Sequence, residues 1–463
     1  MDRPTAPTGR AIVIGASIAG LLAARILREH FDEVVLLERD ALPDAAAPRK
    51  GTPHAAHPHG LLARGREVLE LLFPGFTGAL VARGALPGDI GSEVAVEANR
   101  QRFVRQPIGV QGIAASRLAI EAHLRSRVRD MPGMRLLTEV DVLEPVHAAG
   151  QVRGVRFREH GASAGVTHEL PADLVVDCAG RGSRTPQWLQ AWGYAPAPEE
   201  RVVVDLAYTS AYFARDGAQK PPLAGIVGTA SPAVPRPSIL LAQEPDADGQ
   251  ARWVAGVGGY AGDHVALTRE AMAERAKAIG NAEIAALAEH GELIGPVIRY
   301  VFAHSQRRRY ERLRRFPARY LVLGDAMASF NPVYGQGMTV AACEALALRQ
   351  ALDAGFEGLS QRYFKAAARV VDTPWKLAVG ADLALPFVRG PRPLPVRLIN
   401  AYVARVQRVA VHDALVAAAF VRVMHLLDAP ERLFAPAVLW RVLRRDRSAP
   451  RVQPLPMDRR ATR

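Results

Sequence analysis

A short apolar strand, a glycine turn and a helix near the amino terminus constrain the fold of this chain most strongly. Residues 11–14 read AIVI, and they lead directly into residues 15–20, a Gly-x-Ser-x-x-Gly sequence. Residues 21–31 then repeat apolar side chains at helical spacing. A strand, a tight turn and a helix in this order are typical of the first unit of a nucleotide-binding parallel α/β sheet.

The turn contains the residue types that a bound pyrophosphate requires. Gly15 permits the sharp turn, Ser17 stands where the motif's second glycine lets the backbone approach a phosphate, and Gly20 permits close packing of helix on strand. Free N–H groups and the dipole at the helix N-terminus favour an anion. A predicted strand over residues 33–37 ends at Glu38, in the position of an acid that hydrogen-bonds a ribose hydroxyl. The alternative is an ordinary turn between a strand and a helix.

A second glycine segment, far downstream, indicates which nucleotide is bound. The apolar run of residues 320–323 leads into residues 324–338, GDAMASFNPVYGQGM, and a predicted helix follows over residues 339–352. Asp325 can accept hydrogen bonds from a polyol such as a ribityl chain; its alternative role is to cap the turn. The glycines let the helix N-terminus face the pyrimidine edge of an isoalloxazine, where flavin reduction places negative charge. Together, the two glycine segments predict one flavin site.

Seven motifs give the chain a resemblance to bacterial FAD-dependent monooxygenases. The resemblance covers nearly the whole chain and is greatest to the polyene epoxidases of polyether biosynthesis, of the lasalocid epoxidase type. Squalene epoxidase and the aromatic hydroxylases are more distant. The motifs are GxSxAGLLAAR at 15–25, ERDxLP at 38–43, RxGxP with HxH-LL at 49–62, SRxxxE at 116–121, LVVDCAGRGSR at 174–184, RRRYERL at 307–313 and GDAxxxFNPVYGQGM at 324–338.

The resemblance implies an α/β fold: a discontinuous Rossmann-like FAD-binding domain, an inserted antiparallel β-sheet substrate domain and a helical C-terminal region. The expected FAD-binding domain comprises residues 1–190 and 319–355, the substrate domain residues 191–318, and the helical region residues 356–463. Short alternating apolar runs between proline and glycine clusters agree with a β-sheet in the middle part.

Within the middle part we expect strands over residues 202–208, 238–243 and 251–257, and one helix near residues 269–289. The sequence GVGGYAG at 256–262 is interpreted as a strand end and not as a second nucleotide site, because no apolar-periodic helix begins there.

Two apolar stripes in the C-terminal part predict helices over residues 396–409 and 415–427. The first interpretation is a helix pair packed on the core. The alternative is a lid or a contact with a membrane surface that admits a lipophilic substrate.

The resemblance implies that FAD is bound non-covalently. Arg117 opens a predicted helix over residues 117–129, and the family's matching arginine meets the FAD phosphate or ribose; an exposed helix arginine is the alternative. The expected cofactor-binding residues are Gly15, Ala16, Ser17, Ala19, Gly20, Glu38, Arg39, Arg49, Arg117, Gly180, Asp325, Pro332, Gly335, Gly337 and Met338.

The electron source stays open between NAD(P)H acting directly and a separate flavin reductase. Residues 177–182 read DCAGRG where the aromatic hydroxylases have GADG, and this departure weakens the prediction of a built-in nicotinamide site.

The expected reaction inserts one oxygen atom from O2 into an apolar alkene, by epoxidation, or into an aromatic substrate, by hydroxylation. A flavin hydroperoxide would supply the oxygen, and the protein would supply binding, orientation and a dry pocket. No catalytic side chain is predicted. One alternative is an alkene reductase of the geranylgeranyl reductase type. A flavin halogenase is less favoured, because WxWxIP is absent and Lys50 is the single lysine of the amino-terminal flavin region.

The net charge of +13 raises the question of nucleic-acid binding. The basic residues are almost all arginine and lack interleaved aromatic residues, so we expect no nucleic-acid partner. Residues 307–309 are three arginines with two possible roles. They bind the phosphates of NADPH or a charged end of the substrate, or they form a solvated strand that pairs with Glu311 and other acids.

Cysteine and histidine usage predicts neither a disulfide framework nor a metal site. The chain has 2 cysteines, Cys178 and Cys343, and no CxxC sequence. His54, His57 and His59 lack a helical ligand spacing and a carboxylate partner, so we interpret them as part of a loop that lines the FAD pocket. Without an apolar leader or a run long enough to span a membrane, the expected location is the cytoplasm.

Overall fold

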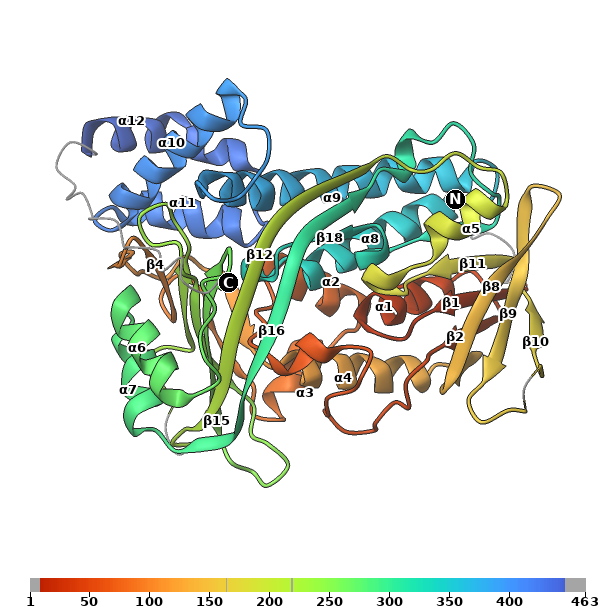
Figure 1. Cartoon of the computed structure of the whole chain (residues 1–463), viewed down its shortest axis with the longest axis horizontal. Helices are drawn as coiled ribbons and strands as arrows, with labels where there is room; N and C mark the ends of the chain where they lie inside the picture. The colour runs from red at the N-terminus through yellow and green to blue at the C-terminus, as the bar shows by residue number, and fades with distance from the viewer. Residues whose placement is uncertain (1–8, 164, 218–219, 446–463) are drawn as a thin grey trace.

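The computed structural model describes residues 9–163, 165–217 and 220–445, and its amino-terminal part is built on a parallel sheet (Figure 1). Five short strands pair in parallel in the order β17-β11-β1-β2-β7. α1 packs on β1 and β2, and α4 packs on β7, so the strands are apolar nearly throughout. The bounds are β1 (Arg10–Ile14), β2 (Glu33–Leu37), β7 (Met134–Leu137), β11 (Leu174–Asp177), β17 (Tyr320–Val322), α1 (Ile18–Leu27), α4 (Arg117–Arg129) and α8 (Gly337–Asp353).

Smaller elements surround this sheet. An antiparallel sheet with the order β10-β9-β8 lies at one end of the molecule (Figure 1). β3 pairs with β6 in a two-stranded ladder. The bounds are β3 (Leu86–Asp89), β6 (Gln111–Ala114), β8 (Val140–Ala148), β9 (Gln151–Glu159), β10 (His168–Pro171), α2 (Ala63–Leu72), α3 (Phe76–Val81) and α5 (Thr185–Ala191).

An eight-stranded sheet with the order β18-β16-β12-β15-β14-β13-β4-β5 forms the second large unit. Its two longest strands, of 16 residues each, run side by side across much of the molecule (Figure 1). The bounds are β4 (Val94–Ala98), β5 (Gln101–Arg102), β12 (Glu199–Ala214), β13 (Gly225–Thr229), β14 (Ser238–Gln243), β15 (Arg252–Tyr260), β16 (Leu293–Arg308) and β18 (Ala328–Ser329).

Strands of the large sheet come from both sides of the domain boundaries that were expected from the sequence. β4 and β5 lie within residues 1–190, yet β4 pairs in parallel with β13 of the large sheet. β18 lies within residues 319–355 and pairs with β16. The two expected parts of the chain therefore interleave, because strand pairing over long sequence separations is decided by tertiary packing.

The single helix expected near residues 269–289 is wrong. Two helices, α6 (Arg269–Ile279) and α7 (Ala282–His290), occupy this segment. Gly280 ends α6 in the left-handed region, at φ +84°, and the Asn281 side chain then caps α7 by accepting a hydrogen bond from the Ile284 N–H. The interpretation of residues 256–262 as a strand end is confirmed, because these residues complete β15 and lead into a turn.

The described part of the expected C-terminal helical region is helical, with α9 (Leu359–Ala384), α10 (Leu394–Ala410), α11 (Ala414–Met424) and α12 (Pro436–Arg445). Residues 446–463 of that expected region lie outside the described residues. The C-terminal half of α10 packs through Val406 and Val409 on α11 and on Phe103 and its neighbours. The amino-terminal half of α10 is different, because Leu394 and Leu398 are 63% and 61% exposed. Among the described residues, no helix has the length and apolar character needed to cross a membrane.

Candidate cofactor site

A cavity of about 730 Å³ lies at the carboxyl ends of the parallel strands. Its wall includes residues that follow four of these strands: Gly15 after β1, Glu38 after β2, Cys178 after β11 and Asp325 after β17. Ligands of open α/β sheets bind at this edge.

The structure brings the predicted cofactor residues together from distant parts of the chain. All of them except Ala16 and Gly20 line the cavity. The residues in the wall are Gly15, Ser17, Ala19, Glu38, Arg39, Arg49, Arg117, Gly180, Asp325, Pro332, Gly335, Gly337 and Met338.

Ala16 and Gly20 act behind the wall. The Ala16 N–H donates to Glu38 Oε2 at 2.8 Å and so orients that carboxylate. A Cβ at Gly20 would lie 1.8 Å from the Gly15 carbonyl oxygen, so only glycine permits this approach of α1 to β1. Gly15 has φ +96°, and a Cβ there would lie 2.7 Å from the Cys178 carbonyl oxygen. The turn therefore needs glycine at both positions for steric reasons.

The N-terminus of α1 faces the cavity without a side-chain cap. Ser17 holds the N-cap position, but its hydroxyl donates to Glu121 Oε2 at 2.9 Å and accepts from Arg117 Nη2 at 2.9 Å. Arg117 lies in the first turn of α4, with a side chain 12% exposed, and its Nε is buried with no hydrogen-bond partner among the described residues. Uncapped N–H groups beside an unsatisfied guanidinium fit an anion such as a pyrophosphate.

Arg49 is bound mainly by protein carboxylates. Its guanidinium lies 2.9 Å from Asp40, 3.0 Å from Glu121 and 3.3 Å from Glu38. The residue lines the cavity, but these contacts make its structural role the orientation of Glu38 and Glu121. Sequence spacing could not show this, because the three acids come from two different segments. Arg39 lies at the edge of the same region with a mostly exposed side chain.

Asp325 presents an unpartnered carboxylate to the cavity. It accepts no hydrogen bond from the residues that the structure describes, and burial raises its pKa although Arg117 and Arg181 lower it. Gly337, at the start of α8, leaves the space beside this carboxylate open, since a Cβ there would lie 3.9 Å from Oδ1. Gln336 Oε1 is also buried without a partner. Buried polar groups that lack partners are rare, so these two fit a ligand rich in hydroxyl and N–H groups.

Several residues of the wall were not predicted from the sequence. One group comes from the β8–β9 hairpin and the segment after β11, and another from β16 and the loop before α8. Arg181 is held there, with its guanidinium 2.7 Å from Ser329 Oγ and over the Phe302 ring. The wall residues in these two groups are Val140, Asp141, Val142, Leu143, Arg158, Arg181, Gly182, Arg184, Trp188, Tyr300, Phe330, Asn331 and Gln336. The quoted motifs at 174–184 and 324–338 contain Arg181, Gly182, Arg184, Phe330, Asn331 and Gln336, and these positions had a detectable signal.

The histidine loop borders the cavity as expected. His54 and His59 line it, and His57 lies behind them with Nδ1 2.9 Å from Ser210 Oγ on β12. Burial lowers the pKa of His54 to about 2, of His59 to about 3 and of His57 to about 4. All three are therefore neutral near pH 7. Within the described part of the chain, no group of three or more His, Cys, Asp and Glu side chains could hold a metal ion.

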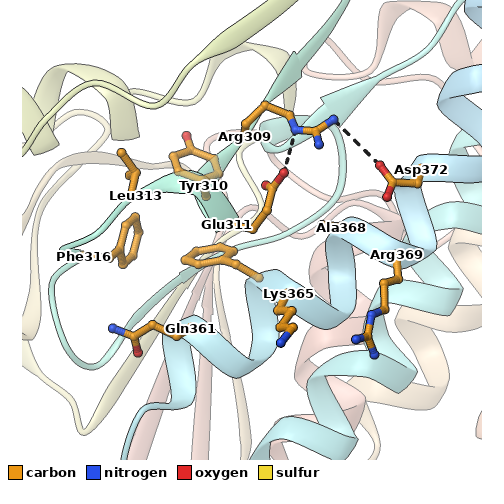
Figure 2. Close-up of a pocket in the computed structure, with 11 residues that line it drawn as sticks. Arg309, Tyr310, Glu311, Leu313, Phe316, Gln361, Lys365, Ala368, Arg369 and Asp372 are labelled. Carbon is orange, nitrogen blue, oxygen red and sulfur yellow. Dashed lines mark ion pairs between the residues drawn. The ribbon is translucent and has the colours of Figure 1, made fainter.

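Of the three arginines at residues 307–309, Arg309 lines a separate cavity of about 400 Å³, between α9 and the segment after β16 (Figure 2). Arg309 contacts Glu311 at 2.6 Å and Asp372 at 3.8 Å (Figure 2), and it also contacts Glu200 at 3.2 Å. Arg307 is buried and lies 2.7 Å from Asp372. These pairs agree with the acid-pairing interpretation, but the side chains are largely buried and not solvated. Neither arginine belongs to the cavity at the parallel strands.

No protein-family model matches the chain. Protein Rv3254 of Mycobacterium tuberculosis (strain ATCC 25618 / H37Rv) is 34% identical over 404 residues, which cover 82% of this chain and 81% of that protein. The chain belongs to the same family as Rv3254. This family membership rests on similarity along most of both sequences.

Several solved structures share the fold of this chain. A flavoprotein/dehydrogenase from Cytophaga hutchinsonii has a TM-score of 0.65 at 15% identity, over 94% of this chain and 96% of that one. PqsL of Pseudomonas aeruginosa, a probable FAD-dependent monooxygenase, has 0.59 at 18% identity, over 81% and 97%. The flavin-dependent brominase Bmp2 has 0.60 at 14% identity, over 90% and 92%. The expected α/β fold is confirmed: it is the fold of these flavoproteins.

Proposed function

We propose that the protein is an FAD-dependent monooxygenase that inserts one oxygen atom of O2 into a lipophilic small molecule. The observation that best supports this is the cavity at the parallel strands, where two distant glycine segments meet. Among the described residues, Arg117 Nε is buried there without a hydrogen-bond partner, and Asp325 accepts no hydrogen bond. The fold shared with FAD-dependent monooxygenases supports the same conclusion.

The side chains suit FAD along the length of the cavity. The start of α1 and Arg117 would hold the pyrophosphate, Glu38 a ribose hydroxyl, and Asp325 a ribityl hydroxyl. The N-terminus of α8, at Gly337, would face the edge of the isoalloxazine that becomes anionic on reduction. The wall offers a separate group for each polar part of the cofactor.

In the proposed reaction, one atom of O2 enters the substrate and the other leaves as water, with two electrons and two protons consumed. Bound FAD supplies the electron transfer to oxygen. The apolar side chains of Phe330, Pro332 and Met338 exclude water from their part of the wall. His54 and His59, neutral through burial, line the cavity without adding a cation.

We propose an apolar alkene or an aromatic ring as the group oxidised, with epoxidation or hydroxylation as the outcome. The resemblance to polyene epoxidases supports the alkene. NAD(P)H or a separate flavin reductase would provide the electrons. Contact with a membrane surface stays a prediction, and the exposed Leu394 and Leu398 of α10 are its candidate residues.

The experiment that tests this function supplies purified, FAD-loaded protein with a reductant, isotopically labelled O2 and a panel of polyenes and phenols. Mass spectrometry should find one labelled oxygen atom in the product. Product formation under strict anaerobiosis, with hydrogen added across a C=C bond, would instead identify the alkene reductase.

A halogenase is the second candidate, because a brominase shares the fold. The cavity wall formed by the described residues contains no lysine, and Lys50 is exposed outside it. This agrees with the lower rank given to the halogenase from the sequence. Adding bromide and chloride to the same assay separates the two functions, since a halogenase yields a halogenated product and a monooxygenase does not.

A further inference from the structure

We propose that Asp382, a carboxyl group outside the cavity, is a positioning residue that fixes the turn of residues 331–334 against the bound cofactor and that transmits its own change of charge to the flavin. The inference rests on the proposed function, since it takes FAD as the occupant of the cavity. We call the segment the 331–334 turn.

Asp382 connects this turn to the last part of α9. The carboxyl group is fully buried. Its Oδ1 accepts a hydrogen bond from Asn331 Nδ2 at 2.8 Å and another from the Tyr334 hydroxyl at 2.8 Å. Asn331 Nδ2 lies 3.3 Å from the Tyr260 hydroxyl, which it also contacts as a donor. Asp382 and Asn331 together therefore join three elements: α9, the turn, and β15 of the large sheet.

The turn itself forms part of the cavity wall. Asn331, Pro332 and Gly335 line the cavity. Asn331 Oδ1 accepts from the Val333 N–H at 3.2 Å, which closes the turn locally, and Gly335 follows in the left-handed region at φ +63°. Because both ends of the Asn331 side chain are used, a change at Asp382 moves backbone that faces the cofactor.

The second oxygen of Asp382 has no partner. Oδ2 is buried and accepts no hydrogen bond among the described residues. The titratable groups that face the carboxyl are Tyr334 of the turn and Tyr260 of β15, and burial beside Asp382 raises the pKa of both phenols, so they stay neutral. Arg392, on the segment after α9, donates to the carbonyl oxygens of Leu383, Leu385 and Val388. No cation therefore pairs with Asp382 in the described structure.

Burial raises the pKa of Asp382 to about 7, against the lowering effect of the hydrogen bonds from Tyr334 and Asn331. Near neutral pH the group thus changes between a carboxylate and a neutral acid. A carboxylate accepts stronger hydrogen bonds than a neutral acid does. The hold on the turn is consequently tighter above this pKa and weaker below it.

The test compares wild type, Asp382→Asn and the matched control Asp353→Asn, whose side chain is 60% exposed at the end of α8. The amide of Asp382→Asn keeps an oxygen for Tyr334 and Asn331 but cannot ionise. Visible-region circular dichroism of bound FAD is recorded from about pH 5.5 to 8.5, together with FAD affinity. The near-ultraviolet tyrosine signal of the FAD-free protein is titrated in parallel.

We expect wild type and Asp353→Asn to show a transition of the flavin signal near pH 7, and Asp382→Asn to lack it while binding FAD within about threefold of wild type. Tyr334→Phe, which removes one donor to the carboxylate, should move the transition to higher pH.

An unchanged flavin transition in Asp382→Asn overturns the inference, and so does a variant that loses only thermal stability. Wild type that takes up no FAD overturns the proposed function. In that case the tyrosine titration separates the two failures: loss of its transition in Asp382→Asn supports the link between Asp382 and the turn, and an unchanged transition refutes it.

Discussion

Replacing Asp325 by alanine should separate cofactor binding from folding. The carboxylate lies in the cavity wall, accepts no hydrogen bond from the described protein and has its pKa raised by burial. Its partner in the proposed complex is a ribityl hydroxyl of FAD. A hydrogen bond to a charged group contributes about 1.5–3 kcal/mol, and about 1.4 kcal/mol corresponds to a tenfold change in affinity. Asp325→Ala should therefore weaken FAD binding about ten- to hundredfold.

The FAD-free protein should respond in the opposite direction. Because the folded-state pKa of Asp325 lies above its ordinary value, the ionised group destabilises the empty fold at neutral pH. Alanine removes that unfavourable contribution, so the melting temperature of the FAD-free variant should equal or exceed that of wild type.

Fluorescence titration with FAD and thermal unfolding of the FAD-free protein measure both effects. Asp353→Ala, on an exposed side chain, serves as the matched control and should leave both values unchanged. Unaltered FAD affinity in Asp325→Ala would refute the assignment of the carboxylate to the cofactor. A large fall in the melting temperature of the FAD-free variant would show instead that Asp325 supports the fold.

Three further predictions follow from named contacts. Gly20→Ala places a Cβ 1.8 Å from the Gly15 carbonyl oxygen and should destabilise the protein by about 1–3 kcal/mol or more, measured by urea unfolding; wild-type stability would contradict the packing argument. Burial raises the pKa of Glu344 to about 8, so the wild-type free energy of unfolding should fall as pH rises from the unfolded pKa towards 8. Glu344→Gln keeps an acceptor for the Gly324 N–H and should show a flatter dependence of the unfolding free energy on pH. Parallel pH profiles of the two proteins would exclude this role of Glu344. If α10 contacts a membrane, Leu398→Glu should reduce co-sedimentation with anionic vesicles at unchanged melting temperature, and equal binding by both proteins would exclude the exposed face.

The parts of the site that are local in sequence could be predicted. The strand over residues 33–37 matches β2, and the helix over residues 117–129 matches α4. The glycine turn was also identified. The steric requirement at Gly20 is local, because a Cβ there would meet Gly15 and Val13. Gly15 could be recognised from the turn motif, although a Cβ there would meet the distant Cys178. Apolar periodicity and glycine chemistry are sufficient for such features.

Contacts between distant segments could not be predicted in the same way. Arg49 was assigned to the cofactor, but its guanidinium is surrounded by Glu38, Asp40 and Glu121, which the sequence does not show to be neighbours. The pairing of β4 with β13 likewise depends on packing between units. Asp382 drew no attention in the sequence because nothing near it suggests a buried carboxyl behind the cavity.

The distribution of the cavity wall along the chain has a consequence for the order of events in the cell. One glycine segment is made near the beginning of synthesis, but Asp325 and the start of α8 follow only after seven of the eight strands of the large sheet have been translated. A ribosome-bound fragment that lacks them has half a binding site and exposes the apolar edge where β17 joins β11. A complete binding site therefore requires synthesis to have passed the start of α8. The supply of FAD would then influence the amount of folded protein in the cell, because a ligand that binds only the folded state stabilises that state by mass action.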